Sequence, residues 1–311
     1  MADEKIATPG ARPGPLQRRR FLARALGLGA GGLGLTAAGR PRVARAAVRP
    51  NAVTDPAILN FALNLEYLEA EFYTYAMTGM GIEAAGIPIT GSGAQGPTTV
   101  KADPVVPFMT PLVQQFAAEL VLDEQKHVVD LRTVLGQMGI TPVAKPAIDL
   151  LNSFNLAARL AGLGSTFDPF ANETNFLLGS YIFEDVGVTA YHGAAPLIRS
   201  KDVLSYAAGI YAVEGYHAGT IRTLLYQRGQ GAATDAISGV RRAASHAADD
   251  YGVDQGPGGE GPAGNTSILL DDANALAFAR SFRQVLNIVY LNPDNPPSGG
   301  FFPAGVNGTI R

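Results

Sequence analysis

Two of the four histidines in this 311-residue chain follow a glutamate by three residues. The two pairs are Glu124-Gln-Lys-His127 and Glu214-Gly-Tyr-His217. Side chains three residues apart lie on the same face of an α-helix, so each pair can direct a carboxylate and an imidazole toward one point. Both groups are ligands for divalent transition metals. The spacing therefore predicts a helix in each segment and favours a fold in which the two helices face a shared site.

Two further glutamates complete an ordered pattern along the chain. Glu66 and Glu184 each precede one of the pairs, and each has a tyrosine seven residues later, Tyr73 and Tyr191. The helix faces that carry the four glutamates are otherwise mostly apolar or small, which predicts that they point into a core. Four buried carboxylates would repel one another and take up protons unless cations neutralised them. The pattern thus predicts a site for two divalent metal ions, with a metal-free helical bundle as the alternative.

The ordered set Glu, Glu-x-x-His, Glu, Glu-x-x-His resembles the ligand set of the ferritin-like superfamily. More narrowly, about residues 52–311 resemble the secreted ferritin-like domain proteins that include the desiccation-associated proteins. The segment from Ile58 to Tyr73 is similar to the opening helix of that family, and the Gly-Gly-Phe-Phe-Pro-Ala-Gly-Val-Asn-Gly run that ends at Gly308 is similar to its C-terminal part. The resemblance implies an all-α, ferritin-like four-helix bundle with a long crossover between its second and third helices.

The resemblance also implies roles for individual residues. The two lone glutamates would each bind one metal, the glutamates of the pairs would bridge both metals, and each histidine would cap one. The implied cofactor is two iron or manganese ions per chain, with the ligands Glu66, Glu124, His127, Glu184, Glu214 and His217. Glu69 departs from the family pattern and is an additional or alternative ligand, or a salt-bridge partner near the rim of the bundle. Tyr73 and Tyr191 would lie near the site, where we favour a hydrogen bond to a ligand carboxylate over electron transfer.

Other acidic and histidine residues lack this spacing. Glu71 and Glu119 point elsewhere on their helices and are expected to be solvated. His192 and His246 are expected to be surface or loop residues.

Capping signals and helix breakers give approximate boundaries. Asp-Pro dipeptides at Asp55 and Asp168 predict helix starts, and glycines or prolines follow the expected ends. The bundle helices are predicted at about 55–77, 110–138, 169–194 and 201–228. The stretch 79–107 is rich in Gly, Pro and Thr, which predicts a long surface excursion that could contain a short hairpin. A fifth, accessory helix is predicted at about 271–291, followed by a Pro/Gly-rich tail that could wrap the bundle.

The N-terminus reads as a targeting segment, about residues 1–46. Arg18-Arg19-Arg20-Phe21-Leu22 resembles a twin-arginine export motif, a small-residue apolar run follows, and Ala44-Arg45-Ala46 fits a cleavage site. The apolar run is too short and Gly-rich for a stable membrane span. The alternative is a basic tail without an export role. Export through this route would place the mature protein in the periplasm or outside the cell.

Charge and composition restrict which binding partners and which kinds of metal site this chain can have. Residues 1–46 contain 9 of the 24 Lys and Arg residues and 2 of the 27 Asp and Glu residues, so the remainder keeps 15 basic and 25 acidic residues and a formal net charge of −10. Such an acidic protein is a poor candidate for binding nucleic acid. The chain has no cysteine, so a transition-metal site must use oxygen and nitrogen ligands, which suits iron or manganese. Residues 47–311 are expected to form one ferritin-like domain, and a homo-oligomer is compatible with the sequence.

Three classes of function remain. The resemblance to manganese catalases and rubrerythrins implies an oxidoreductase that reacts with a small oxidant, peroxide or oxygen, in stress protection. A second class is metal storage or sequestration, as in ferritins. The long loops do not favour assembly of many copies into a closed shell of the ferritin type. The third is a desiccation-stress or structural protein whose metal stabilises the bundle without turnover.

Overall fold

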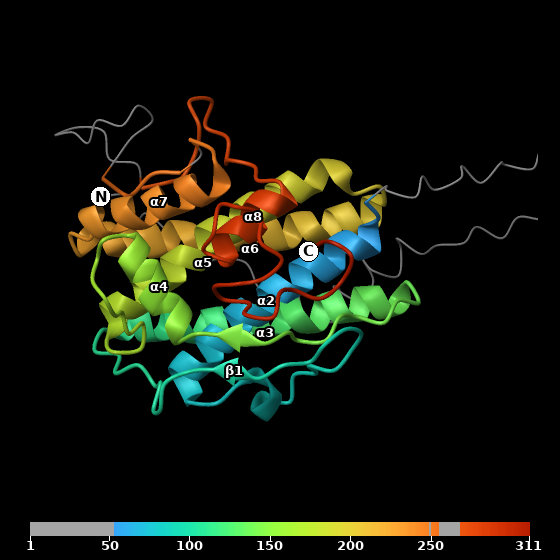
Figure 1. Cartoon of the computed structure of the whole chain (residues 1–311), viewed down its shortest axis with the longest axis horizontal. Helices are drawn as coiled ribbons and strands as arrows, with labels where there is room; N and C mark the ends of the chain where they lie inside the picture. The colour runs from blue at the N-terminus through green and yellow to red at the C-terminus, as the bar shows by residue number, and fades with distance from the viewer. Residues whose placement is uncertain (1–52, 249, 255–267) are drawn as a thin grey trace, which may run out of the picture. The chain divides into compact units, whose positions relative to one another are not determined.

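The computed structural model describes residues 53–248, 250–254 and 268–311, and the regular secondary structure in them is helical apart from one pair of two-residue strands (Figure 1). The expected all-α bundle is therefore confirmed. The predicted export signal at 1–46 lies outside the described residues.

Four long helices form the bundle, and they lie close to the predicted ranges: α2 (Asp55–Thr78), α3 (Pro111–Gln137), α5 (Glu173–Ala194) and α6 (Lys201–Gln227). α2 packs along α3, α5 packs along α6, and α2 also contacts α5. The faces between these helices supply most of the buried apolar residues, including Leu63, Leu120, Phe176 and Ile221. The core of the bundle therefore surrounds the faces that carry the Glu and His pattern.

The starts of α2 and α5 correct two capping predictions. Thr54, not Asp55, caps α2, because its side chain accepts a hydrogen bond from the Ala57 amide. The Asp55 carboxylate instead accepts hydrogen bonds from the backbone amides of Arg199 and Ser200, which fixes the start of α6 against the start of α2. At the other site, Asn172 caps α5, and Asp168 forms an ion pair with Lys101 at 2.6 Å. An Asp-Pro signal locates the entry to a helix but not which side chain caps it.

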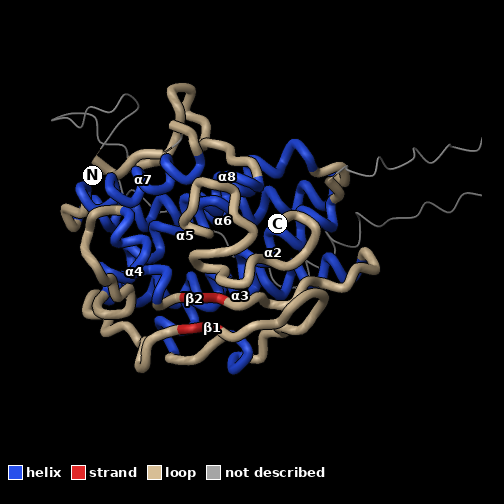
Figure 2. The backbone as a smooth tube through the Cα atoms, viewed as in Figure 1, coloured by secondary structure: helices blue, strands red, loops and turns tan. Residues whose placement is uncertain are grey.

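The excursion after α2 pairs with the crossover that joins α3 to α5. β1 (Thr98–Thr99) and β2 (Ile148–Asp149) are parallel, with Thr98 opposite Ile148, and Figure 2 shows the two strands side by side. The excursion also contains the short 3₁₀ helix η1 (Ile82–Ala85). The hairpin considered for 79–107 is thus replaced by a pairing between two segments far apart in the sequence.

Three shorter helices pack against the bundle: α4 (Asn152–Leu160), α7 (Gly231–Ser245) and α8 (Phe282–Val289). The predicted accessory helix at 271–291 is too long, because only 282–289 is helical and Ser281 forms a capping box at its start. The sequence did not predict α7. Four of its buried residues are Thr234, Ser238, Arg241 and Ser245, so the helix carries no clear apolar stripe.

The C-terminal tail lies across the bundle beside α2 and α8 (Figures 1 and 2). Phe301 and Phe302 are fully buried. Asn64 of α2 exchanges two hydrogen bonds with the backbone of Asn307, and the Asn307 side chain bonds to Ala94 in the excursion. The tail therefore joins α2 to the loops that cover it. None of the described helices has the length and hydrophobicity needed to cross a bilayer.

Candidate metal centre

The six residues predicted as ligands converge in the middle of the bundle. α2 supplies Glu66, α3 supplies Glu124 and His127, α5 supplies Glu184, and α6 supplies Glu214 and His217. All six are buried, with no side chain more than one tenth exposed. Each helix directs one face inward, so the spacings read from the sequence place all the donor groups in one region.

The first half of the cluster is built around His127. Its Nδ1 atom lies 3.1 Å from Glu66 Oε2, 3.2 Å from Glu124 Oε2 and 3.7 Å from Glu214 Oε1. One potential ligand atom from each of these four residues lies within 4.8 Å of the others. Three carboxylates and one imidazole therefore surround a common point.

The second half is built around His217. Its Nδ1 atom lies 3.1 Å from Glu124 Oε1 and 3.2 Å from Glu184 Oε2. Glu124 thus presents one oxygen to each half, as a bridging carboxylate would, and the two imidazole rings are 6.4 Å apart between centroids. A carboxylate oxygen of Glu214 converges with the ligand atoms of the His127 half and not with those of the His217 half, so the two halves differ in their number of carboxylates.

Several buried atoms of the cluster have no hydrogen-bond partner. They are Glu124 Oε1, Glu184 Oε2, both carboxylate oxygens of Glu214, and His217 Nδ1. His217 Nδ1 is within ion-pair distance of the first two oxygens, but the geometry does not form a hydrogen bond. Buried polar atoms are normally paired, and leaving a charged one unpaired is unfavourable. Unpaired oxygen and nitrogen atoms that face a common region are the donors that two divalent cations would satisfy. The residues present therefore fit a pair of metal ions with oxygen and nitrogen ligands.

Comparison with known proteins agrees with this geometry. Residues 54–227 match the model of the ferritin-like domain family. The chain belongs to this family. It is 32% identical over 273 residues to the desiccation-related protein PCC13-62 of Craterostigma plantagineum, an alignment that covers 82% of this chain and 83% of that protein. It is 28% identical over 271 residues to the ferritin-like catalase Nec2 of Nesocodon mauritianus, covering 81% of this chain and 83% of the relative.

In this ferritin-like protein, the two tyrosines form hydrogen bonds between helices α2 and α5. The Tyr73 hydroxyl donates a hydrogen bond to Glu184, and the Tyr191 hydroxyl donates one to Glu66. Each tyrosine therefore holds the glutamate of the opposite helix, which requires α2 and α5 to run antiparallel. In both contacts the phenol binds Oε1, and Oε2 faces a histidine. The tyrosines thus fix the orientation of the two lone carboxylates.

Asp123 is a partner of the cluster that the sequence analysis missed. Its Oδ2 lies 3.4 Å from Nε2 of His217, the ring nitrogen that faces away from the carboxylates. A carboxylate on the outer nitrogen of a metal-binding histidine orients the ring and fixes its tautomer. The available signal was its position next to Glu124, but spacing alone does not reveal that it reaches across to α6.

Replacing Asp123 with Asn should weaken metal binding by roughly 10–100-fold, the usual effect of losing such an outer carboxylate. Competition with a chelator measures the change. Asp130, which is exposed on the same helix, provides the matched control as Asp130→Asn. Equal metal affinities for both variants and the wild type would remove Asp123 from the site.

Glu69 is buried, with 4% of its surface exposed, so it does not lie at the rim of the bundle. It is not one of the residues whose ligand atoms converge. It lies beside Gly187, which follows Glu184 by three residues as Glu69 follows Glu66. A Cβ atom on Gly187 would be 2.1 Å from Glu214 Oε2 and 3.5 Å from Glu69 Oε1. The absence of a side chain at 187 therefore leaves room for both carboxylates.

The cluster retains protons in the absence of cations. Burial raises the pKa of Glu66 to about 7, although the charge of His127 opposes the shift. Burial and the neighbouring carboxylates Glu69 and Glu124 raise the pKa of Glu214. Burial lowers the pKa of His127, but Glu124 and Glu66 outweigh it and raise that pKa to about 11. Metal ions must therefore displace protons in order to bind.

The remaining candidate residues lie away from the cluster, and one expectation about them is wrong. Glu119 is exposed, but Glu71 is buried and lies 3.3 Å from Lys145, because the excursion and the crossover cover the outer face of α2. His192 is half-buried in α5 and lies 3.1 Å from the Phe278 carbonyl oxygen. His246 is exposed at the end of α7.

Proposed function

We propose that this ferritin-like protein binds two transition-metal ions, iron or manganese, and reacts with peroxide or dioxygen in stress protection. The convergence of four carboxylates and two imidazoles, five of whose buried donor atoms have no hydrogen-bond partner, is the observation that carries the proposal. The relative named as a ferritin-like catalase supports the reaction class.

The proposed ligand roles follow from which atoms face one another. Glu124 would bind both metals, Glu66 would serve the His127 half, and Glu184 would serve the His217 half. Glu214 would bind on the His127 side and could bridge, as the ferritin-like ligand set implies. A pair of redox-active metal ions would supply two-electron chemistry with a small oxidant.

The protein's own residues would control that chemistry. Tyr73 and Tyr191 would keep one oxygen of each lone carboxylate hydrogen-bonded, so that the other stays directed at the metals. Asp123 would hold the His217 ring. The apolar residues around the cluster, including Leu120 and Ile221, would exclude water from the site. These interactions fix the donor atoms before metal binds, which reduces the reorganisation needed during the reaction.

Metal affinity should increase with pH. Because the pKa of His127 in the metal-free protein is raised to about 11, its proton must leave at any lower pH, and below pH 7 the proton on Glu66 must leave as well. Each displaced proton weakens apparent binding by about tenfold for every unit that the pH falls. Calorimetric titrations in buffers with different ionisation enthalpies would count the released protons. Binding without proton release would contradict the assigned ligands.

Two measurements test the proposed function. Elemental analysis of protein from its native host should find about two iron or manganese ions per chain, as a di-metal bundle requires. The loaded protein should consume peroxide or dioxygen, and a Glu124→Ala variant should not. Absence of turnover in fully loaded protein would favour the alternative that metal only stabilises the bundle, which the similarity to a desiccation-related protein supports. Iron loading far above two ions per chain would instead indicate sequestration.

We also propose that residues 1–46 direct export through the twin-arginine pathway, on the basis of Arg18-Arg19-Arg20-Phe21-Leu22 and the apolar run after it. Replacing Arg18 and Arg19 with Lys keeps the charge and should block export, leaving the protein in the cytoplasm of its host. Cell fractionation followed by immunoblotting measures the distribution. Normal secretion of the variant would exclude this route.

A further inference from the structure

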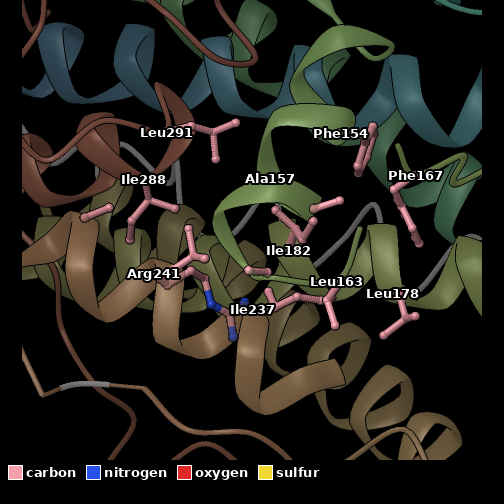
Figure 3. Close-up of a pocket in the computed structure, with 14 residues that line it drawn as sticks. Phe154, Ala157, Leu163, Phe167, Leu178, Ile182, Ile237, Arg241, Ile288 and Leu291 are labelled. Carbon is pink, nitrogen blue, oxygen red and sulfur yellow. The ribbon is translucent and has the colours of Figure 1, made fainter. Parts of the chain in front are cut away.

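An apolar cavity lies between α4, α5, α7 and α8. Figure 3 shows side chains from these helices around it, including Phe154, Ala157, Ile182 and Ile288. Arg241 is the one charged residue of its lining, and its guanidinium group is bound to Asp185 and Asp250. The cavity has a volume of about 30 Å³. We call it the outer cavity, because its lining reaches the surface at Leu163, which is 43% exposed.

A second cavity lies nearer the candidate metal centre, between α2, α5, α8 and the C-terminal tail. Its volume is about 20 Å³, and Ile182 and Ile288 line it as well as the outer cavity. We call it the inner cavity. Because the same two side chains border both spaces, the cavities are adjacent, with Ile182 and Ile288 at their shared boundary. Rotamer changes in Ile182 and Ile288 would open one cavity to the other.

The inner cavity reaches residues that lie beside the candidate metal centre. Glu69 and Gly187 are part of its lining. The position that a Cβ atom on Gly187 would occupy is 2.1 Å from Glu214 Oε2. The glycine therefore leaves this end of the cavity next to a carboxylate of the cluster. Two adjacent apolar cavities thus lie between the surface at Leu163 and the residues beside Glu214.

The size and the apolar lining of the cavities determine which molecules could enter them. Both exceed the roughly 10–15 Å³ that one water molecule needs, and both are far below the ~300–1,000 Å³ of pockets for organic ligands. Apolar cavities of this kind stay dry and accept apolar guests such as xenon. A peroxide molecule would lose its hydrogen bonds to water on entering and would find almost no partners there. Dioxygen has no such bonds to lose.

We propose that the outer and inner cavities form an entry route for dioxygen, gated by Ile182 and Ile288 and ending at Gly187. The route deepens the proposed function, since it favours dioxygen over peroxide as the oxidant that arrives from this side. The cavities themselves do not depend on bound metal, so their gas binding can be tested separately from any reaction.

Xenon pressurisation of metal-free crystals of the full chain tests the cavities directly. We expect xenon in both, with the inner atom near Gly187. An Ile288→Phe variant should fill the boundary and lower the xenon occupancy of the inner cavity. An Ile288→Val variant widens the boundary without overpacking and should raise that occupancy, so the test does not depend on the larger residue folding well. Ile148→Val, a buried change of the same size at a residue of β2 that lines neither cavity, should leave xenon binding unchanged.

Stopped-flow measurements on protein loaded with Fe²⁺ test the route itself. Ile288→Phe should slow oxidation by dioxygen by tenfold or more, Ile288→Val should not slow it, and the reaction with peroxide should change less than twofold in either variant. Absence of xenon from both cavities would overturn the proposal, as would equal dioxygen rates in Ile288→Phe and the wild type. If xenon binds as expected but metal-loaded protein reacts with neither oxidant, the cavities are confirmed as gas-binding sites. The proposed redox function is then wrong.

Discussion

Replacing Glu124 and Glu214 together with Ala should abolish the binding of transition metals. Glu124 presents one oxygen to each histidine, so its loss removes a donor from both halves of the cluster. Glu214 contributes two buried oxygens without hydrogen-bond partners, and its loss leaves the His127 half with one carboxylate, Glu66. Apart from Glu66 and Glu184, no other acidic residue in the described part of the chain belongs to the converging groups, so no substitute ligand is in place.

Metal content by mass spectrometry and thermal unfolding measure this effect together. Metal present at 100 times its dissociation constant adds about 2.7 kcal/mol to stability, or roughly 5–10 °C in Tm for a domain of this size. The wild-type protein should show that shift, and the double variant should show none. Glu119→Ala, which removes an exposed carboxylate from the same helix as Glu124, is the control and should behave as wild type. Full metal content in the double variant would show that the ligand assignment is wrong.

The sequence predicted the parts of this site that depend on one helix at a time. The three-residue spacing from Glu124 to His127 fixes both side chains on one helix face whatever the rest of the fold does. The same reasoning holds for Glu214 and His217. The confirmed all-α fold follows from the same local rules, because apolar stripes and breaker residues predict long helices.

What the sequence did not predict depends on contacts between helices. Asp123 contacts His217 of α6, and Tyr73 donates a hydrogen bond to Glu184 of α5. The spacing of residues within one helix predicts neither of these partners. Glu71 was expected in solvent, but a lysine 74 positions later in the chain covers it. The helix α7 was missed because Arg241 on its buried face is satisfied by Asp185 and Asp250 rather than by apolar neighbours. Such buried polar partners come from tertiary packing.

Gly187 provides the sharpest test of how closely that packing is fitted to the cluster. Replacing it with Ala would place a Cβ atom 2.1 Å from Glu214 Oε2, well inside van der Waals contact, so the carboxylate must move. We expect metal affinity to fall by at least ~10–100-fold, because a ligand is displaced rather than merely left unsupported. Overpacking should also destabilise the metal-free protein by about 1–3 kcal/mol, which exceeds the ~0.5–1 kcal/mol that alanine gains over glycine within a helix.

Gly209→Ala is the matched control for this prediction. Gly209 also lies inside a bundle helix, α6, but a Cβ atom there would meet no atom within 4 Å. The control should keep its metal affinity and gain about 0.5–1 kcal/mol in the free energy of unfolding, while Gly187→Ala loses both. Chemical denaturation of the metal-free proteins and chelator competition measure the two quantities. If both variants bind metal like the wild type, Glu214 can move without consequence and is not a ligand. If only Gly187→Ala fails, the backbone of α5 approaches the cluster so closely that glycine is required at this position.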